Sequence, residues 1–373
     1  MTDFLPAVRA TVDERTPAAL EEHVAPLAHL GAPLDEFLDP VRDLVRGGKR
    51  LRALLCAAGW LAAGGDPDPG HPVLRHSGAA LELFQAAALV HDDVMDGAHT
   101  RRGRPAAHRA LARGHAEAAR LGDADLFGVS GAIVLGDLLL AASSAELELA
   151  RAHVREPGAA RRGREVFDLM CLEVAVGQFL DIRAQDLPWR TSGDALDSAL
   201  LVVKHKSARY SVEHPLALGA ALAGADRAFE DRLRAVGLPL GEAFQLRDDE
   251  LGVFGSPQVT GKPAGDDLRE GKRTALLAIT LDRLDAGTPD GQAGPAGAAR
   301  VRDLVGRPDL DAAQVEEVRG YMRACGALTA HEELVVQRRD AGMSALADLD
   351  GALPAQARAT LAELADLLTT RTS

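Results

Sequence analysis

The chain has 373 residues, enough for one large domain or two smaller ones, and 47% of them are hydrophobic, which allows a substantial core. Only 3% are aromatic, and alanine and leucine dominate the apolar residues, a composition that favours helix packing over sheets. The formal net charge of −13 argues against a protein that binds nucleic acid or anionic membranes through its overall charge.

The three cysteines also restrict the class of protein. Cys56, Cys171 and Cys325 are widely spaced and form no C-x-x-C pair, so we expect reduced thiols rather than a disulfide framework or a zinc site. The N-terminal residues lack the plan of a signal peptide. No stretch reaches about 18 uncharged apolar residues, so no membrane span is expected. Together these features predict a cytoplasmic protein.

Two amphipathic helices are expected over residues 4–30 and 34–45, followed by a basic turn that reads R-G-G-K-R-L-R at 46–52. Glycines just before a helix let the backbone approach a ligand, and a helix N-terminus attracts phosphate. Lys49 and Arg52 are three residues apart and are expected to share a face at the start of the next helix, 51–63. Taken alone, this turn is more typical of a solvated basic surface than of a binding site.

The stretch that carries the chemistry follows an apolar helical run, 81–90, and reads H-D-D-V-M-D at 91–96. Asp92 and Asp96 are four residues apart and therefore lie on one helix face, while Asp93 points about 100° away. Gln85, two turns before Asp92, shares its face. Two carboxylates with room for water suit Mg²⁺, which completes its shell with substrate phosphates.

Arg101 and Arg102 follow this acidic motif closely. Paired guanidinium groups bind anions, so the metal-binding carboxylates and this arginine pair together suggest a diphosphate substrate. Each motif alone is also typical of a solvated helix end or face. A second, similar site elsewhere in the chain decides between these interpretations.

The middle of the chain is predicted to be helical with polar connections. We expect residues 103–122 to be irregular, a long apolar helix over 126–149 with a buried Asp137, and a helix over 165–184. After a loop at 186–194, the next helix carries Lys206 and Ser207 and ends near Pro215. Lys206 is a candidate phosphate ligand, and Ser207 is a candidate for polarising the site.

The second acidic motif lies on a helix expected over 230–251, which reads F-Q-L-R-D-D-E at 244–250 and places Gln245 just before Asp248. The loop at 252–271 contains Gly and Pro, and its Lys262, with Lys272 directly after it, is expected to close onto a bound anion. Residues 287–297 read as a disordered surface loop, and 298–373 as amphipathic helices. No strand pattern is evident.

These motifs occur in one order from residue 47 to 274, and with them the chain resembles the trans-isoprenyl diphosphate synthases of the polyprenyl synthetase family. The resemblance rests on G-G-K-R-L-R at 47–52, D-D-V-M-D at 92–96, R-R-G at 101–103, K-S at 206–207, F-Q-L-R-D-D at 244–249 and G-K-P-A-G-D-D at 261–267. It is most like bacterial geranylgeranyl diphosphate synthases. The resemblance implies a single all-α domain over 1–373, a helical bundle around a central cavity (the isoprenoid synthase fold), and a homodimer.

The resemblance also implies the reaction. An allylic diphosphate ionises, isopentenyl diphosphate attacks the allylic cation, and a proton is lost, with up to three Mg²⁺ in each active site. By motif position, the metal ligands would be Asp92, Asp96 and Asp248. The allylic diphosphate would be held by Arg101, Lys206 and Lys262, and isopentenyl diphosphate by Lys49, Arg52, Gln85 and Arg102. Ser207 and Gln245 would line the region where the cation forms, and Lys272 matches a later basic position of the family.

Three positions depart from the family pattern. Gly252 stands where the family often has the last Asp of the second motif, and Ser256 stands where it commonly has another Asp. Ser207 replaces the usual Thr and keeps the hydroxyl. Because Asp248 is retained, we expect the loss at Gly252 to be tolerated, and an inactive partner subunit is the alternative.

Product length depends on the side chains that precede Asp92. Ala87 and Ala88 are small, whereas Phe84, about one turn deeper, is bulky. This pattern favours all-trans geranylgeranyl diphosphate, with farnesyl or longer products as neighbours. Two further alternatives are a class I terpene cyclase and a non-catalytic modulatory subunit. The basic residues of the isopentenyl diphosphate pocket argue against the cyclase.

Overall fold

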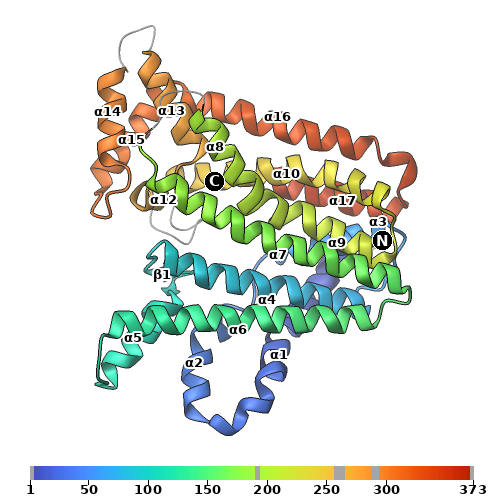
Figure 1. Ribbon diagram of the computed structural model, residues 1–373. Coiled ribbons are helices and arrows are strands. Elements are labelled where there is room, and N and C mark those ends of the chain that lie inside the picture. The colour runs from blue at the N-terminus through green and yellow to red at the C-terminus, as the bar shows by residue number, and fades with distance from the viewer. Residues whose placement is uncertain (1–3, 190–193, 256–264, 288–293, 370–373) are drawn as a thin grey trace. The chain divides into compact units, whose positions relative to one another are not determined.

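Helices make up almost all of the computed structural model, which describes residues 4–189, 194–255, 265–287 and 294–369. Figure 1 shows the helices with one small hairpin, β1 (Thr100–Arg101) paired antiparallel with β2 (Arg104–Pro105). The prediction of an all-α chain is therefore confirmed. The hairpin was not predicted, because strands of two residues leave no periodic pattern.

The contacts divide the chain into two compact units. Unit 1 comprises Met1–Val166, Pro215–Glu230 and Leu353–Thr360, and unit 2 comprises Phe167–His214, Asp231–Ala352 and Leu361–Ser373. Four of the described helices contribute residues to both units: α7 (Pro157–Asp186), α9 (His214–Ala223), α10 (Arg227–Phe254) and α17 (Ala355–Thr369).

Unit 1 contains the N-terminal helices and the first acidic motif. Its elements are α1 (Phe4–Val24), a 3-10 helix (Ala25–Leu30), α2 (Ala32–Arg42), α3 (Leu51–Ala62), α4 (Pro72–Met95), the hairpin, α5 (Ala107–Glu117), α6 (Ala124–Ala152) and most of α9 (His214–Ala223).

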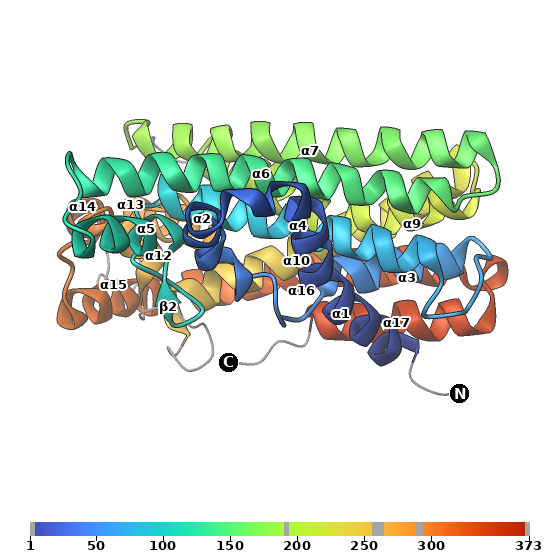
Figure 2. The same ribbon diagram turned by 90° about the horizontal axis from the view of Figure 1, so that it is seen from below.

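The long helix α4 packs along α6, and both run side by side in Figures 1 and 2. Small residues allow this close approach, since a Cβ atom on Gly136 would lie 2.1 Å from His91 Nε2. The Ser143 hydroxyl donates to the Ala80 carbonyl oxygen at 2.6 Å, which satisfies a buried polar group between the two helices. The packing fixes the axis of α4, whose C-terminal end carries the first acidic motif.

A buried carboxylate ties α1, α4 and α6 together. Glu146 on α6 is fully buried and accepts hydrogen bonds from Arg15 Nε at 2.6 Å, His76 Nδ1 at 2.6 Å and His23 Nε2 at 2.9 Å. Burial alone would raise the pKa of Glu146, but the hydrogen bonds from His76 and Arg15 lower it to about 2. The carboxylate therefore stays charged and fully paired.

Unit 2 holds the second acidic motif and the C-terminal helices. Besides its parts of α7, α9, α10 and α17, it contains α8 (Asp194–Val202), a π-helical segment (Val203–Glu213), α12 (Asp266–Glu270), α13 (Ala275–Ala286), α14 (Pro295–Leu304), α15 (Ala312–Ala324), α16 (Ala327–Ala347) and a 3-10 turn (Asp350–Ala352).

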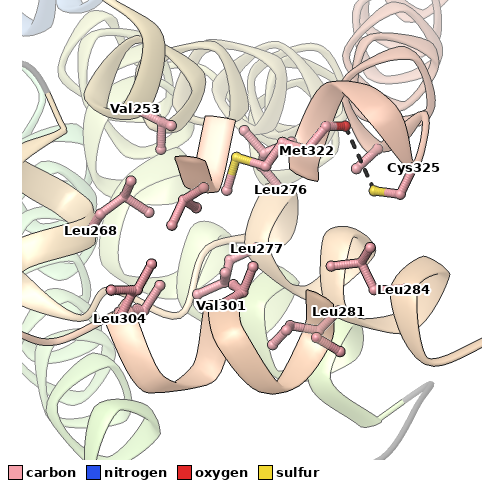
Figure 3. Packing of buried hydrophobic residues seen from close by; sticks show 14 of the residues in the cluster. Val253, Leu268, Leu276, Leu277, Leu281, Leu284, Val301, Leu304, Met322 and Cys325 are labelled. Carbon is pink, nitrogen blue, oxygen red and sulfur yellow. Dashed lines mark hydrogen bonds between the residues drawn. The ribbon is translucent and has the colours of Figure 1, made fainter. Parts of the chain in front are cut away.

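Apolar side chains from α10, α12, α13, α14 and α15 form a core cluster in unit 2. Figure 3 shows Leu276 and Leu277 of α13 among Val301, Leu304 and Met322. The Cys325 thiol donates to the Met322 carbonyl oxygen at 3.6 Å and points into this cluster (Figure 3). The cluster anchors α12, because Leu268 is only 2% exposed within it.

Several element predictions were wrong. Residues 103–122 were expected to be irregular but contain α5, which packs against α6 where Gly128 leaves room for the His108 carbonyl oxygen. Asp137 was expected to be buried, yet its side chain is 66% exposed, 3.6 Å from His91 Nε2. The helix that was expected to end near Pro215 passes instead into α9, where Pro215 occupies the first turn and needs no N–H partner.

Other predicted boundaries were too short or fall partly outside the described residues. Helix α7 begins at Pro157 rather than near residue 165, and α10 extends to Phe254. Within the predicted loop 252–271, residues 256–264 lie outside the described residues and 266–270 form α12. Of the predicted loop 287–297, residues 288–293 also lie outside them, and α14 begins at Pro295.

Among the residues that the structure describes, one helix is long and apolar enough to cross a membrane by length and composition. It is α6, Ala124–Ala152, and 39% of its most apolar window is buried. Asp137 interrupts its apolar sequence. Because α4 and α5 cover much of α6, the helix also fits a role in the core of unit 1.

Candidate active site

The first acidic motif ends α4. Asp92 lies in the last turn, and Asp96 caps the helix with its N–H donating to the Asp92 carbonyl oxygen at 2.8 Å. The two residues thus stand on successive turns, and both side chains are partly exposed. Asp93 differs, because only 2% of it is exposed. The motif therefore presents two accessible carboxylates and one buried one.

Asp93 holds the first arginine of the R-R-G motif. Arg101 donates from Nε to both Asp93 oxygens, at 3.0 and 3.2 Å, and also from Nη2. The same Nη2 lies 3.7 Å from Asp92 Oδ2. Arg101 was predicted to bind an anion directly, whereas Asp93 had no predicted role. The structure makes Asp93 the residue that orients Arg101 beside Asp92.

Arg102 reaches toward the basic turn. It has a left-handed φ of 52° in the β1–β2 hairpin, and Nη1 donates to the Leu44 carbonyl oxygen at 3.1 Å. A Cβ atom on Gly48 would lie 3.3 Å from Arg102 Nη2, so the missing side chain leaves space for the guanidinium. Burial, followed by the nearby Arg50 charge, lowers the pKa of Arg102.

Arg50 shapes the basic turn itself, and sequence analysis assigned it no role. It is 3% exposed and pairs with Asp13 at 2.7 Å and Glu82 at 3.2 Å. Lys49 is exposed in the turn before α3, and Arg52 lies in the first helical turn. The two predicted ligands are therefore not on one helical face, since Lys49 precedes the helix.

The residues predicted to line the substrate chain lie on α4. Gln85 and Ala88 are partly exposed, whereas Phe84 is 4% exposed and Ala87 is fully buried. Ala87 belongs to a core cluster with Leu83, Val90 and residues of α6. Of the two alanines, Ala88 is thus the more accessible.

A cavity of about 710 Å³ lies within unit 1 beside the arginine pair. Its wall includes Asp93, Arg101 and Arg102, together with Asp35 and Asp39 of α2 and residues of α5. Pockets for small ligands have volumes of this order. The guanidinium groups therefore border a space large enough to admit a ligand.

In unit 2, Lys206 and Ser207 lie on the π-helical segment, both partly exposed. Lys206 Nζ donates to Asp181 Oδ2 of α7 at 2.5 Å. The segment packs tightly on α7, because a Cβ atom on Gly177 would lie 2.4 Å from the Lys206 backbone nitrogen. Short π-helical stretches often mark functional sites. Sequence analysis did not identify Asp181. A nearby signal is Gln178, a polar residue one helical turn before it on α7.

The second acidic motif lies near the end of α10. Asp248 is exposed, and Gln245 Nε2 donates to Asp249 Oδ1 at 2.7 Å. Burial, and then the Asp267 charge, hold the pKa of Asp249 well above its usual value. Asp248 is the more accessible carboxylate of the two.

Lys272 is ion-paired rather than turned outward. Its Nζ lies 2.8 Å from Glu270 Oε2 and 3.7 Å from Asp267 Oδ1. Lys262, the other predicted anion ligand of this loop, lies outside the described residues, as does Ser256. The two units thus each present an acidic motif with a neighbouring cation, Arg101 in the first and Lys272 in the second, while Lys206 of unit 2 pairs with Asp181.

The candidate carboxylate ligands fit Mg²⁺ better than a metal ion that is enclosed by protein side chains alone. Within the described residues, no group of three or more His, Cys, Asp or Glu side chains is arranged to hold a metal ion. Mg²⁺ commonly takes only one or two carboxylates and fills its other positions with water and substrate phosphates. Asp92, Asp96 and Asp248 offer carboxylates of this kind.

Comparison with known proteins agrees with this geometry. The Polyprenyl synthetase family matches residues 35–318. A geranylgeranyl diphosphate synthase of Mycobacterium tuberculosis is 33% identical over 333 residues, 88% of this chain and 84% of that protein. A (2E,6E)-farnesyl diphosphate synthase of Mycobacterium bovis is 33% identical over 266 residues, 70% of this chain and 64% of that protein.

Solved structures give the same result. The crystal structure of geranylgeranyl pyrophosphate synthase from Corynebacterium glutamicum, complexed with isoprenyl diphosphate and magnesium, is 36% identical. It superposes with a TM-score of 0.87 and covers 98% of this chain and 99% of that one. The match in sequence and in fold extends over nearly the whole chain, and the chain therefore belongs to the polyprenyl synthetase family of trans-prenyltransferases.

Proposed function

We propose that the chain is a Mg²⁺-dependent synthase that condenses isopentenyl diphosphate with allylic diphosphates to give all-trans geranylgeranyl diphosphate. The observation that carries this proposal is the end of α4, where Asp92 and Asp96 stand on successive turns beside an arginine that Asp93 orients. The relatives named as geranylgeranyl diphosphate synthases support the twenty-carbon product.

In this proposal, Mg²⁺ binds through Asp92, Asp96 and Asp248, with up to three ions per active site. When bound, the ions neutralise the charge that develops on the pyrophosphate leaving group. The magnesium in the related Corynebacterium structure supports the choice of ion. The protein would contribute one or two carboxylates to each ion, and water and substrate phosphates would fill the ion's other positions.

The basic residues divide between the two substrates. Arginine binds phosphate oxygens in a bidentate manner, and lysine acts as a point charge. The pairing of Arg101 with Asp93 and of Lys206 with Asp181 keeps two of these cations oriented before substrate arrives. We assign the allylic diphosphate to Arg101, Lys206 and Lys262, and isopentenyl diphosphate to Lys49, Arg52, Gln85 and Arg102. Lys272 is a further candidate for substrate binding.

Ser207 and Gln245 are assigned to the region where the allylic cation forms. Oxygen dipoles from a hydroxyl and an amide stabilise positive charge without attacking it. The hydrogen bond from Gln245 Nε2 to Asp249 leaves the amide oxygen as the outward dipole. The proton released at the end of condensation would pass to the departing pyrophosphate.

Product length is assigned to α4. Ala88 is small and partly exposed, so a growing chain can pass it, while the larger Phe84 about one turn deeper limits further extension. Ala87 packs in the core cluster and so supports the side chains that limit the product length. These positions favour twenty carbons over the fifteen that a bulky residue at position 88 would give.

We also propose that the chain forms one domain and acts as a cytoplasmic homodimer. The family match at 35–318 runs through both units, which supports a single domain. Apolar side chains are exposed on two helices, a pattern typical of interfaces between subunits; they are Leu126, Ile133 and Val134 on α6, and Leu172, Val176 and Phe179 on α7. The free cysteines fit a reducing compartment.

The test is an incubation of purified protein with labelled isopentenyl diphosphate and dimethylallyl, geranyl or farnesyl diphosphate, with Mg²⁺ or with a chelator. We expect a linear twenty-carbon product only when Mg²⁺ is present. A different linear length would overturn the product assignment. A cyclic hydrocarbon would indicate a cyclase, and no turnover would indicate a modulatory subunit.

Two variants make this test specific. Asp92→Ala is expected to lower kcat by roughly 100-fold or more, because it removes a carboxylate that binds the metal. Asp137→Ala is the matched control, since Asp137 is exposed on α6 and has no assigned role. Equal activity of the two variants would refute the metal assignment.

A further inference from the structure

Arg273 directly follows Lys272 and precedes Thr274, the N-cap residue of α13. Its side chain is half-buried, and its Nε atom is buried without a hydrogen-bond partner. Among the described residues, no carboxylate forms an ion pair with it, and burial lowers the pKa of Arg273 to about 10. A desolvated cation without a counter-charge costs free energy. The contacts of Arg273 must therefore account for its presence.

Those contacts hold the C-terminal end of α7. Arg273 Nη2 donates to the Gln185 carbonyl oxygen at 3.2 Å, in the last turn of a helix that ends at Asp186. A cation at this place satisfies a carbonyl that has no partner within the helix and interacts favourably with the helix dipole. The guanidinium carbon also lies 3.1 Å from the centroid of the Trp189 ring, in a cation–π contact. Arg273 thus grips both the end of α7 and the residue just beyond it.

The start of α13, on the other side of this contact, is held firmly. The Thr274 hydroxyl accepts the Leu277 N–H at 3.3 Å, which caps the helix. Leu276 and Leu277 are buried in the unit 2 core (Figure 3), and Trp189 packs against the same cluster. Arg273 therefore joins the end of α7 to a part of unit 2 that is fixed by capping and packing.

Each of the two joined segments is close to a residue considered for substrate binding. On α7, Asp181 lies about one turn before Gln185 and accepts a hydrogen bond from Lys206 at 2.5 Å. On the other segment, Lys272 is the chain neighbour of Arg273. Misplacement of binding groups by about 1 Å can cost about 100-fold in rate. A contact that fixes one segment relative to the other therefore has a consequence for catalysis.

We propose that Arg273, stacked on Trp189, is a positioning residue that fixes the end of α7 relative to Lys272. The contact keeps Lys206 and Lys272 at the separation that the allylic diphosphate requires. This inference rests on the proposed function, which assigns Lys206 to that substrate. Neither Arg273 nor Trp189 belongs to the motifs that carry the family resemblance, and neither needs to touch substrate for this role.

The test compares the steady-state kinetics of full-length variants with Mg²⁺, isopentenyl diphosphate and geranyl diphosphate. Arg273→Met should raise the KM for geranyl diphosphate by about tenfold, because the two lysines are no longer held in register. The KM for isopentenyl diphosphate should stay within about twofold of the parent, since the ligands assigned to it lie in unit 1. Trp189→Leu should have the same effect, and the double variant should resemble each single variant, because residues that act as a pair are not additive.

Arg283→Met is the matched control. Arg283 of α13 also donates to a carbonyl oxygen, that of Cys325 at 3.3 Å, and has no assigned role. Fluorescence tests the stacked pair itself in a Trp60→Phe background, where Trp189 is the only tryptophan because the chain has two. There, Arg273→Met should shift the emission of Trp189, since a charge is removed from above its ring, and Arg283→Met should leave it unchanged.

A parent-like KM for geranyl diphosphate in both Arg273→Met and Trp189→Leu would overturn the proposal. An equal rise of both KM values, or the same rise in Arg283→Met, would show a general loss of structure and would overturn it as well. These kinetic results remain valid if the Trp60→Phe background folds poorly. No turnover of the parent would refute the proposed function on which the inference rests.

Discussion

Replacement of Asp93 by alanine tests whether the buried acid of the first motif orients Arg101. The carboxylate is 2% exposed and accepts hydrogen bonds from Nε and Nη2 of Arg101. Its removal leaves a guanidinium without its main partner. We therefore expect Asp93→Ala to impair both folding stability and allylic substrate binding.

The magnitude follows from the burial of the pair. Removing one partner of a buried ion pair costs about 3–5 kcal/mol. Arg101 is 18% exposed and lies 3.7 Å from Asp92, so water and a second carboxylate recover part of the loss. We expect a loss of about 2–3 kcal/mol in the free energy of unfolding, within the range of hydrogen bonds to charged groups.

The assay combines urea denaturation with steady-state kinetics. We expect the KM for the allylic diphosphate to rise by about 10- to 100-fold, since 1.4 kcal/mol corresponds to about tenfold in binding. Asp137→Ala serves as a control and should change stability by less than about 0.5 kcal/mol. An unchanged KM together with parent-like unfolding of Asp93→Ala would show that Asp93 does not orient Arg101.

Three other variants address separate parts of the chain. Glu146→Gln should lower the free energy of unfolding by about 3 kcal/mol near neutral pH, because the pKa of Glu146 falls from 4.5 to about 2 on folding. Urea titrations should show that the difference between the variant and the parent shrinks as the pH drops below about 4.5. A difference that does not depend on pH would contradict this expectation. Ala88→Phe should shorten the linear product, which chromatography would measure. An unchanged product length would show that other residues limit the growth of the chain. Asp181→Ala should raise the allylic KM by about tenfold, because Lys206 loses a partner at 2.5 Å; equal kinetics would show that the pair is only structural.

The acidic motifs could be located from sequence because each ends an apolar helix, and helical spacing fixes which side chains share a face. The same reasoning failed for Asp137. A long apolar helix shows that burial is extensive but does not show which side faces a neighbour, and Asp137 lies on the exposed side of α6. Sequence thus predicted the elements better than the orientation of single residues.

Side-chain pairs between segments were beyond sequence reasoning. Arg101 meets Asp93 only because the chain reverses in a hairpin with a left-handed residue at Arg102. Sequence revealed the missing acid at Gly252 but not the close approach of Asp267 to this glycine, because α12 reaches α10 through packing among distant residues. Such contacts depend on tertiary structure that has no local signature.

The π-helical stretch Val203–Glu213 gives this part of the chain a tolerance of length changes that an ordinary helix lacks. Its i→i+5 hydrogen bonds accommodate more residues per turn than the i→i+4 bonds of an α-helix. Deleting one residue within the stretch would return one turn to α-helix and keep the later side chains on their faces, whereas a deletion in an ordinary α-helix rotates every later side chain by about 100°. Natural variants that lack one residue here should therefore keep the orientation of the helix that follows.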